Sequence, residues 1–235
     1  MNLSLTSFNI ITPLVFLLTY FSAFKGGKMI CDNYLRNTFL YILSVYCLFI
    51  TSLSYEKENN LMNQKNNLRT IGFIVTFIAI FGLYFTKNII LRHLCLFAII
   101  IFIGLSSYDF INQFDPEIIE QTAIRTFIAT ILSILFVLKY GHLLKEKGYN
   151  YLLSFFLVLF IVYLLDVHFI SKSHSLTYSY IFIGVFVGFL LYDIKFILQR
   201  KQNCNSSNVD YIDTTLDIFL DTMNIFKQGL LLSDN

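Results

Sequence analysis

The stretch "VDYIDTTLDIFLDTMNIF", Val209 to Phe226, is nearly apolar enough for a membrane helix, yet it contains four aspartates and no basic residue. Three of them, Asp213, Asp217 and Asp221, recur every fourth residue, and this spacing places them along one face of a helix. The other side carries apolar residues at helical spacing, so the stretch predicts an amphipathic helix.

This helix should not enter a membrane alone. Between residues 209 and 232, eleven Val, Leu, Ile or Phe residues contribute roughly −3 to −7 kcal/mol to insertion, whereas three aspartates cost roughly 7.5 to 10.5 kcal/mol. The helix could instead lie on the membrane surface or stand within a helix bundle. Surface helices are normally basic and this one is acidic, so we expect it in a bundle with its carboxylates on a watery cavity.

The rest of the chain is strongly apolar. Of its 235 residues 56% are hydrophobic and 14% charged, and the mean hydropathy is +0.66. A soluble domain of this size needs more polar surface, so the composition indicates an integral membrane protein. The net charge of +2 gives no indication of nucleic-acid binding, and the scattered cysteines indicate neither a disulfide framework nor a metal site.

Eight apolar segments have the length that a bilayer requires. Because hydrocarbon leaves no partner for an open backbone group, we expect all eight to be helices. The first segment is either a signal peptide or an extra helix, and its lack of a basic leader favours the helix. The segments span residues 8–24, 36–54, 70–86, 88–108, 118–139, 150–170, 176–198 and 209–232.

Basic residues gather on one side of this predicted bundle. With eight crossings, eleven Lys or Arg residues lie on the side of the first, third, fifth and seventh connections, against five on the other side. This bias predicts that the first set is cytosolic. The eleven are Lys25, Lys28, Arg36, Lys87, Arg92, Lys139, Lys145, Lys147, Lys195, Arg200 and Lys201.

Two aspartates on neighbouring helices are expected at similar depth. Asp193 lies fifteen residues before Asn208, near the last short connection, and Asp221 lies thirteen residues after it. Two carboxylates that meet in a medium of low dielectric cannot easily both ionise, so they share a proton. Such a pair predicts a pH sensor and, when deprotonated, an oxygen site for Ca²⁺.

The last two segments resemble the C-terminal signature of the transmembrane Bax inhibitor motif family. That family typically carries Tyr-Asp in its sixth helix and Leu-Asp-x-x-Asn-[Leu/Ile]-Phe in its seventh. Here these are Tyr192-Asp193 and Leu220 to Phe226, and Leu35-Arg36 resembles the start of its first helix. The chain looks like a divergent member near the Bax inhibitor, Lifeguard and Golgi anti-apoptotic branches.

The resemblance implies an all-α, polytopic fold: an N-terminal hydrophobic segment over residues 1–33, as an extra helix, and a seven-helix bundle over residues 34–235. It also implies a pH-sensitive Ca²⁺ or cation leak channel of the endoplasmic reticulum or Golgi membrane that suppresses cell death. Asp193 and Asp221 would sense pH and bind the ion. The implied partners are membrane lipid, Ca²⁺, protons and cell-death regulatory membrane proteins, with no cofactor besides the ion.

Other residues receive secondary roles. Asp213, Asp217 and Asn224 are predicted to line the mouth of the pore. In the family an Arg near the end of the second helix can latch the sixth-helix aspartate, and the matches here are Lys87 and Arg92. Lys is the poorer bidentate partner. Arg125 is expected either to pair with an acid or to pack against headgroups.

Two alternatives stay open. A non-conducting membrane adaptor could inhibit apoptosis through protein contacts. An intramembrane aspartyl protease also places two aspartates on adjacent helices, but such enzymes carry Gly-x-Gly-Asp and Pro-Ala-Leu, which this sequence lacks. We therefore expect no enzyme.

Gly184 and Gly188 form GxxxG, which indicates close helix packing.

Overall fold

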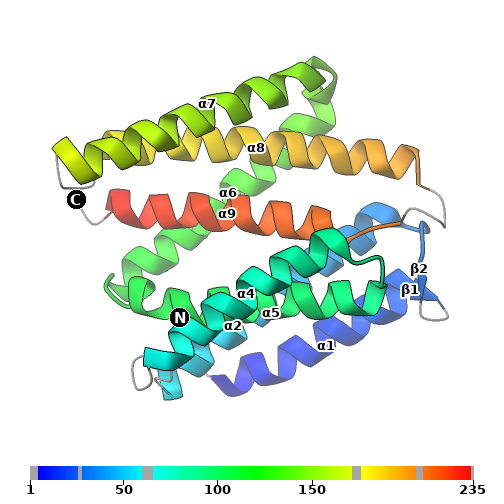
Figure 1. Ribbon diagram of the computed structural model, residues 1–235. Coiled ribbons are helices and arrows are strands. Elements are labelled where there is room, and N and C mark those ends of the chain that lie inside the picture. The colour runs from blue at the N-terminus through cyan, green and yellow to red at the C-terminus, as the bar shows by residue number, and fades with distance from the viewer. Residues whose placement is uncertain (1–4, 26–27, 60–65, 171–175, 205–208, 234–235) are drawn as a thin grey trace. The chain divides into compact units, whose positions relative to one another are not determined.

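The computed structural model describes residues 5–25, 28–59, 66–170, 176–204 and 209–233. These residues form eight α-helices and one two-stranded antiparallel hairpin (Figure 1). The elements are α1 (Leu5–Ala23), β1 (Phe24–Lys25), β2 (Lys28–Met29), α2 (Tyr34–Asn59), α4 (Asn66–Phe85), α5 (Ile89–Ile111), α6 (Pro116–Tyr140), α7 (Glu146–Leu165), α8 (Leu176–Gln202) and α9 (Ile212–Ser233).

All eight predicted segments are helices, which confirms the all-α fold. Five are long and apolar enough to cross a bilayer: α2, α5, α6 with the 3₁₀ turn after it, α7 with the π turn after it, and α8. The apolar parts of α1 and α4 are shorter, at Ile10–Ala23 and Thr70–Phe85. The acidic α9 is not among the five. The chain is therefore a multi-pass membrane protein.

The chain divides into two compact units. Unit 1 contains residues Met1–Gln113 and Asn203–Phe219, and unit 2 contains Phe114–Gln202 and Leu220–Asn235. Unit 1 thus holds α1, α2, α4, α5 and the first part of α9, whereas unit 2 holds α6, α7, α8 and the rest of α9. The predicted division into an N-terminal segment, residues 1–33, and a helix bundle, residues 34–235, does not correspond to these two units and stays a prediction.

Buried hydroxyl groups tie α1 to α2 within unit 1. The Thr19 hydroxyl lies 2.7 Å from that of Ser44, and the Thr12 hydroxyl lies 2.7 Å from that of Thr51. The Ser22 hydroxyl donates to Asn37 Oδ1 over 2.6 Å. Hydroxyl pairs of this kind hold transmembrane helices together where the surrounding side chains are apolar.

The α2 and α5 backbones approach closely at Gly104. A Cβ at this position would lie 2.8 Å from the Phe49 carbonyl oxygen and 2.7 Å from the Ser52 Cβ, so only glycine fits without a shift. One helical turn beyond Ser52, the Glu56 side chain is fully buried on the same face of α2. The predicted segment ends at residue 54, whereas α2 continues to Asn59.

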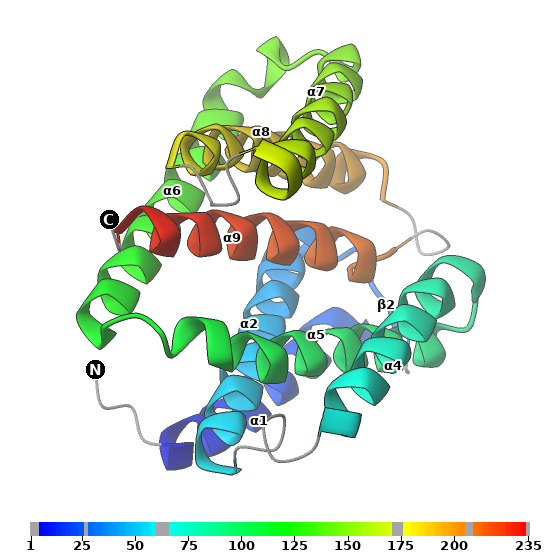
Figure 2. The same cartoon turned by 60° about the vertical axis from the view of Figure 1, so that its left-hand side comes forward.

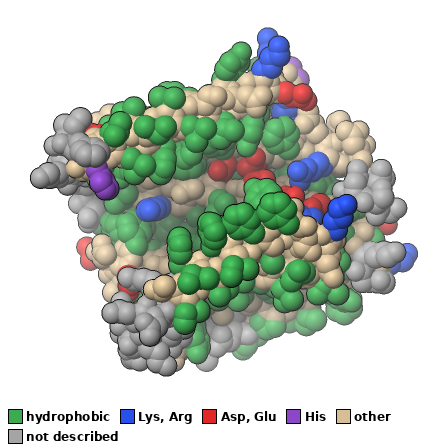
Figure 3. Space-filling view, viewed as in Figure 1, with side chains coloured by type: hydrophobic (Ala, Val, Ile, Leu, Met, Phe, Trp, Pro, Cys, Tyr) green, Lys and Arg blue, Asp and Glu red, His purple; other side chains and the backbone are tan. Residues whose placement is uncertain are grey.

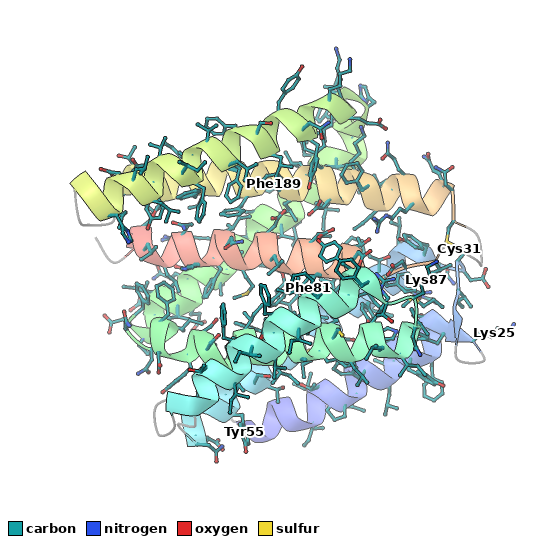
Figure 4. All side chains as sticks on the ribbon, viewed as in Figure 1. Lys25, Cys31, Tyr55, Phe81, Lys87 and Phe189 are labelled. Atoms are coloured by element: carbon teal, nitrogen blue, oxygen red, sulfur yellow. A yellow bond between two sulfur atoms is a disulfide. The ribbon has the colours of Figure 1, made fainter. Side chains whose placement is uncertain are left out.

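A disulfide links Cys31 to Cys204 across 173 residues of sequence. Cys31 precedes α2 and Cys204 follows α8, and Figure 4 shows Cys31 at the same end of unit 1 as Lys25 and Lys87, opposite Tyr55. The expectation of no disulfide was wrong because it relied on sequence spacing, whereas the fold brings two distant connections together. Cys47 and Cys95 are buried free thiols.

Aromatic packing dominates unit 2. Tyr149 at the start of α7 contacts Phe189, Tyr192 and Phe196 of α8, and Phe156 contacts Phe186 and Phe189. A Cβ on Gly188 would lie 2.9 Å from Leu152 Cδ2, whereas one on Gly184 would meet nothing within 4 Å. The glycine pair thus contributes to packing between α7 and α8 through one member.

Hydrophobic side chains also cover outward-facing helix surfaces. Figure 3 shows them along α7, and a second set along α4 in unit 1. On α7 the exposed residues include Phe155, Val158 and Ile161. Side chains of this kind on the outside of an apolar helix face lipid in a membrane protein.

Candidate functional site

Asp193 is buried on the apolar face of α8. It is 9% exposed and lies one turn from Phe189 and Leu190 on one side and from Ile197 on the other. A carboxylate in the middle of such a stripe interrupts helical packing that an apolar residue would complete. In a membrane protein this placement points to a functional residue.

Asp221 is buried to the same degree on α9. It is 8% exposed, and its neighbours Ile218, Thr222 and Ile225 are also buried. Both aspartates belong to unit 2, where α8 and the second part of α9 run antiparallel beside each other (Figures 1 and 2). The structure thus supports the expected neighbouring helices, and the sharing of a proton stays a prediction.

The end of α8 that carries Asp193 is fixed to the connection between α6 and α7. The Tyr192 hydroxyl donates to the Lys145 carbonyl over 3.1 Å, and the Lys195 ammonium donates to the Leu144 carbonyl. A Cβ on Gly148 would overlap the Tyr192 hydroxyl oxygen. These contacts orient α8 so that Asp193 faces inward while Tyr192 faces the connection.

The last turns of α9 pack on α6. A Cβ on Gly229 would lie 2.8 Å from the Thr122 methyl group, and Arg125 donates to Ser233 Oγ over 3.5 Å and to Gln121 Oε1 over 3.3 Å. The Arg125 guanidinium therefore bonds to neutral groups of this helix pair. The expectation that it pairs with an acid is not met among the described residues.

A second charged cluster lies at the start of α9, within unit 1. The guanidinium of Arg92, in the first turn of α5, donates to Asp210 Oδ2 over 2.7 Å and to Asp213 Oδ1 over 2.6 Å. The other oxygen of Asp210 accepts a hydrogen bond from the Ile212 backbone N–H over 2.8 Å. Asp210 therefore caps the helix and anchors it to α5.

The predicted latch and mouth residues fall in different surroundings. Lys87 is exposed in the connection between α4 and α5, and it makes no ion pair within the described ranges. Arg92 holds Asp210 and Asp213. Asp217 is exposed, whereas Asn224 is partly buried. The roles of Lys87 and Arg92 toward Asp193, and of Asp213, Asp217 and Asn224 at a pore mouth, stay predictions.

Sequence reasoning missed a buried polar pair beside Arg92. The Tyr41 hydroxyl is hydrogen-bonded to His93 Nδ1, and the His93 ring also packs against Phe24 and Phe97. The helical spacing of Asn37, Tyr41 and Ser44 on the buried face of α2 is the signal that could have indicated a polar partner here.

Asp193 and Asp221 do not by themselves supply the ligands of a complete Ca²⁺ site. Ca²⁺ takes about 6 to 8 oxygen ligands, and Asp193 and Asp221 supply at most four oxygens. Among the residues that the structure describes, no group of three or more His, Cys, Asp or Glu side chains is placed to hold a metal.

The family model and the two relatives that match this sequence all belong to Bax inhibitor proteins. The family described as inhibitor of apoptosis-promoting Bax1 matches residues 31–232. Bax inhibitor 1 of Drosophila melanogaster is 26% identical over 178 residues, covering 71% of this chain and 69% of that protein. A probable Bax inhibitor 1 of Paralichthys olivaceus is 26% identical over 144 residues, covering 58% and 56%. No solved structure matches the chain. The chain belongs to the Bax inhibitor family.

Proposed function

We propose that this chain is an anti-apoptotic membrane protein that leaks Ca²⁺ or related cations across an intracellular membrane in a pH-dependent way. The observation that carries the proposal is the burial of Asp193 and Asp221, at 9% and 8% exposure, on α8 and α9 of one unit. A buried carboxylate in an apolar helix destabilises the fold unless it is compensated. Ionisable residues buried within membrane helices commonly mark ion or proton pathways, which supports a role for this pair.

Protonation would control the conducting state. When the two carboxylates share a proton, a hydrogen bond holds α8 and α9 together and a net charge of about −1 remains. When both are ionised, repulsion separates them, and their oxygens can replace part of the water shell of Ca²⁺. Alkaline conditions on the side from which the pair titrates therefore favour flux, and acidic conditions reduce it.

Reconstituted flux tests the proposal. The purified full-length chain is placed in liposomes loaded with a Ca²⁺ indicator, and the rate of Ca²⁺ entry is measured over a pH series for wild type, Asp193→Asn and Asp221→Asn. Asp115→Asn is a matched control, because Asp115 is an exposed residue before α6 whose side chain makes no capping bond. The proposal fails if both buried substitutions leave the rate and its pH profile unchanged.

A non-conducting inhibitor is the second candidate. The family description, inhibitor of apoptosis-promoting Bax1, favours it because the words name a protein as the target. Such an adaptor would bind cell-death regulatory membrane proteins through its helices. Protection from an apoptotic stimulus in cells that express the Asp193→Asn, Asp221→Asn double variant, measured together with store Ca²⁺, separates the two. Full protection without a leak supports the adaptor.

The endoplasmic reticulum or the Golgi is the proposed location, since a leak lowers store Ca²⁺ only from a membrane that encloses a store. Multiple apolar helices with short connections support membrane insertion. A tagged full-length chain should overlap with markers of these membranes in fluorescence microscopy. Exclusive overlap with a plasma-membrane marker would overturn this part of the proposal.

A further inference from the structure

The Cys31–Cys204 disulfide is one of several contacts that hold the start of α9; together with the Arg92 ion pairs we call them the clamp. In addition to the disulfide, the Tyr211 hydroxyl donates to the Ile30 carbonyl, and the Asn37 amide donates to the Tyr211 hydroxyl over 3.5 Å. The rings of Tyr34 and Tyr211 pack with centroids 5.3 Å apart. One residue before Tyr211, Asp210 holds Arg92 over 2.7 Å. Every one of these residues belongs to unit 1.

This arrangement joins three parts of the chain at one end of unit 1. The disulfide and Tyr211 attach the approach to α9 to the segment before α2, and Arg92 attaches it to α5. The covalent bond is the link that solution chemistry can open without changing a residue. Cys31 and Cys204 are both partly exposed, whereas Cys47 and Cys95 are buried. A dissolved thiol can therefore reach the linked pair.

The distribution of basic residues predicts on which side of the membrane the disulfide lies. In the eight-crossing arrangement predicted from the sequence, Cys31 lies in the first connection and Cys204 in the seventh, on the side to which eleven of the basic residues are assigned. That bias is typical of the cytosolic side. Disulfides on the cytosolic side are usually transient or redox-sensing, because the glutathione pool reduces them. A fixed structural disulfide would instead require the opposite orientation.

We propose that Cys31 and Cys204 form a reversible thiol–disulfide site, open to cytosolic glutathione, that controls how firmly the start of α9 is held. In the reducing step a glutathione thiolate attacks one cysteine sulfur and the S–S bond breaks, which leaves a mixed disulfide and one protein thiolate. A second glutathione thiolate then attacks the mixed disulfide. The protein gains two thiols and two glutathione molecules become one oxidised glutathione.

Reduction removes the covalent link and leaves the start of α9 to Arg92 and Tyr211. The first turn of α9, Ile212–Leu216, then opens more often, and its backbone amides exchange faster. This consequence does not depend on ion conduction. It therefore stands or falls separately from the proposed leak.

The first test asks whether the site is open to the cytosol. Cells that express the full chain are permeabilised at the plasma membrane only and treated with glutathione buffers of graded reduction, and free thiols are labelled with a large maleimide that does not cross intracellular membranes. We expect two added labels on Cys31 and Cys204 as the buffer becomes reducing. An absence of labelling until the internal membrane is dissolved would overturn the proposal, since the pair would then face the oxidising side.

The second test asks what the bond controls. Hydrogen exchange is measured on the purified chain in nanodiscs, oxidised and then reduced with glutathione, and we expect exchange in Ile212–Leu216 to rise about tenfold on reduction. Cys31→Ser should exchange as fast as the reduced wild type and should not respond to glutathione. The Cys47→Ser, Cys95→Ser double variant is the control and should respond like wild type. Equal exchange in oxidised and reduced wild type would overturn the proposal, and this comparison needs no variant to fold.

Discussion

The two units differ in where their polar groups lie between helices. Unit 1 uses polar and covalent links between helices: hydroxyl pairs such as Thr19 with Ser44, the Arg92 ion pairs and the Cys31–Cys204 disulfide. Unit 2 packs its helices through aromatic rings and buries the carboxylates of Asp193 and Asp221 on apolar stripes. Polar groups that bond across helices stabilise the first unit. The second unit places two carboxylates on buried, mostly apolar helix faces, a position that membrane proteins commonly reserve for functional residues.

The largest expected effect is a loss of Ca²⁺ flux when the α9 carboxylate of unit 2, rather than one of unit 1, is removed. Asp221→Asn removes the buried acid of unit 2, and we expect loss of the pH-dependent Ca²⁺ flux by about tenfold or more, because the shared proton is gone. Asp213→Asn removes an acid that is 49% exposed and held by Arg92. Its flux should fall much less. Liposome flux measures both, and equal losses would break the comparison between the regions.

A side chain on Gly104 should destabilise unit 1 strongly. Gly104→Leu forces α2 away from α5, since even a Cβ meets the Phe49 carbonyl at 2.8 Å, and overpacking of this kind costs about 3 kcal/mol. Gly184→Leu is the matched control in unit 2, where a Cβ meets nothing within 4 Å. The midpoint of thermal unfolding in detergent should fall for the first variant and stay near wild type for the second. A fall for Gly184→Leu alone would show that this glycine has a packing role that Gly104 lacks.

Loss of the Arg92 guanidinium should have a smaller effect on stability. Its side chain is 16% exposed, and Asp213 is half exposed, so solvent screening reduces the value of the second pair. We expect Arg92→Gln to lower the free energy of unfolding by about 1 to 3 kcal/mol. Arg92→Lys, which keeps the charge but not the fork, should recover part of the loss. The account of the clamp is wrong if Arg92→Gln unfolds at the wild-type midpoint.

The hydroxyl pairs should give the smallest effect. Thr19→Val keeps the shape of the side chain and removes the bonds to Ser44 and to the Leu40 carbonyl. Hydrogen bonds between transmembrane helices average about 0.6 kcal/mol, and the shift in the unfolding midpoint should be correspondingly small. A double-mutant cycle with Ser44→Ala isolates the pair. An interaction energy of zero in that cycle would remove the hydroxyl link from the description of unit 1.

The helices were predictable from the sequence because hydrocarbon imposes a strong requirement on every segment. Runs of apolar residues of bilayer length must be helical, and α8 begins at the predicted Leu176. The excess of aspartates also predicted that α9 would differ from the other segments, and it is not among the five that are apolar enough to cross. In both cases the decisive information lies within one segment.

Pairings between distant segments could not be predicted in the same way. Nothing in the spacing of Cys31 and Cys204 indicates a bond across 173 residues. The bonds of Arg92 to Asp210 and Asp213 were not anticipated either, and its role toward Asp193 stays a prediction. The predicted segment 36–54 ends before Glu56, although Glu56 shares the buried face of α2 with Ser52. Each outcome depends on which helix is the neighbour, and single segments do not carry that information.

The pH profile of Ca²⁺ flux in liposomes, with wild type and Asp221→Asn measured side by side, tests whether the buried carboxylates control conduction. We expect the wild-type rate to rise as the medium becomes more alkaline, and the rate of the variant to be low and independent of pH. A variant whose flux follows the wild-type profile would contradict the claim that the buried carboxylates of α8 and α9 control conduction.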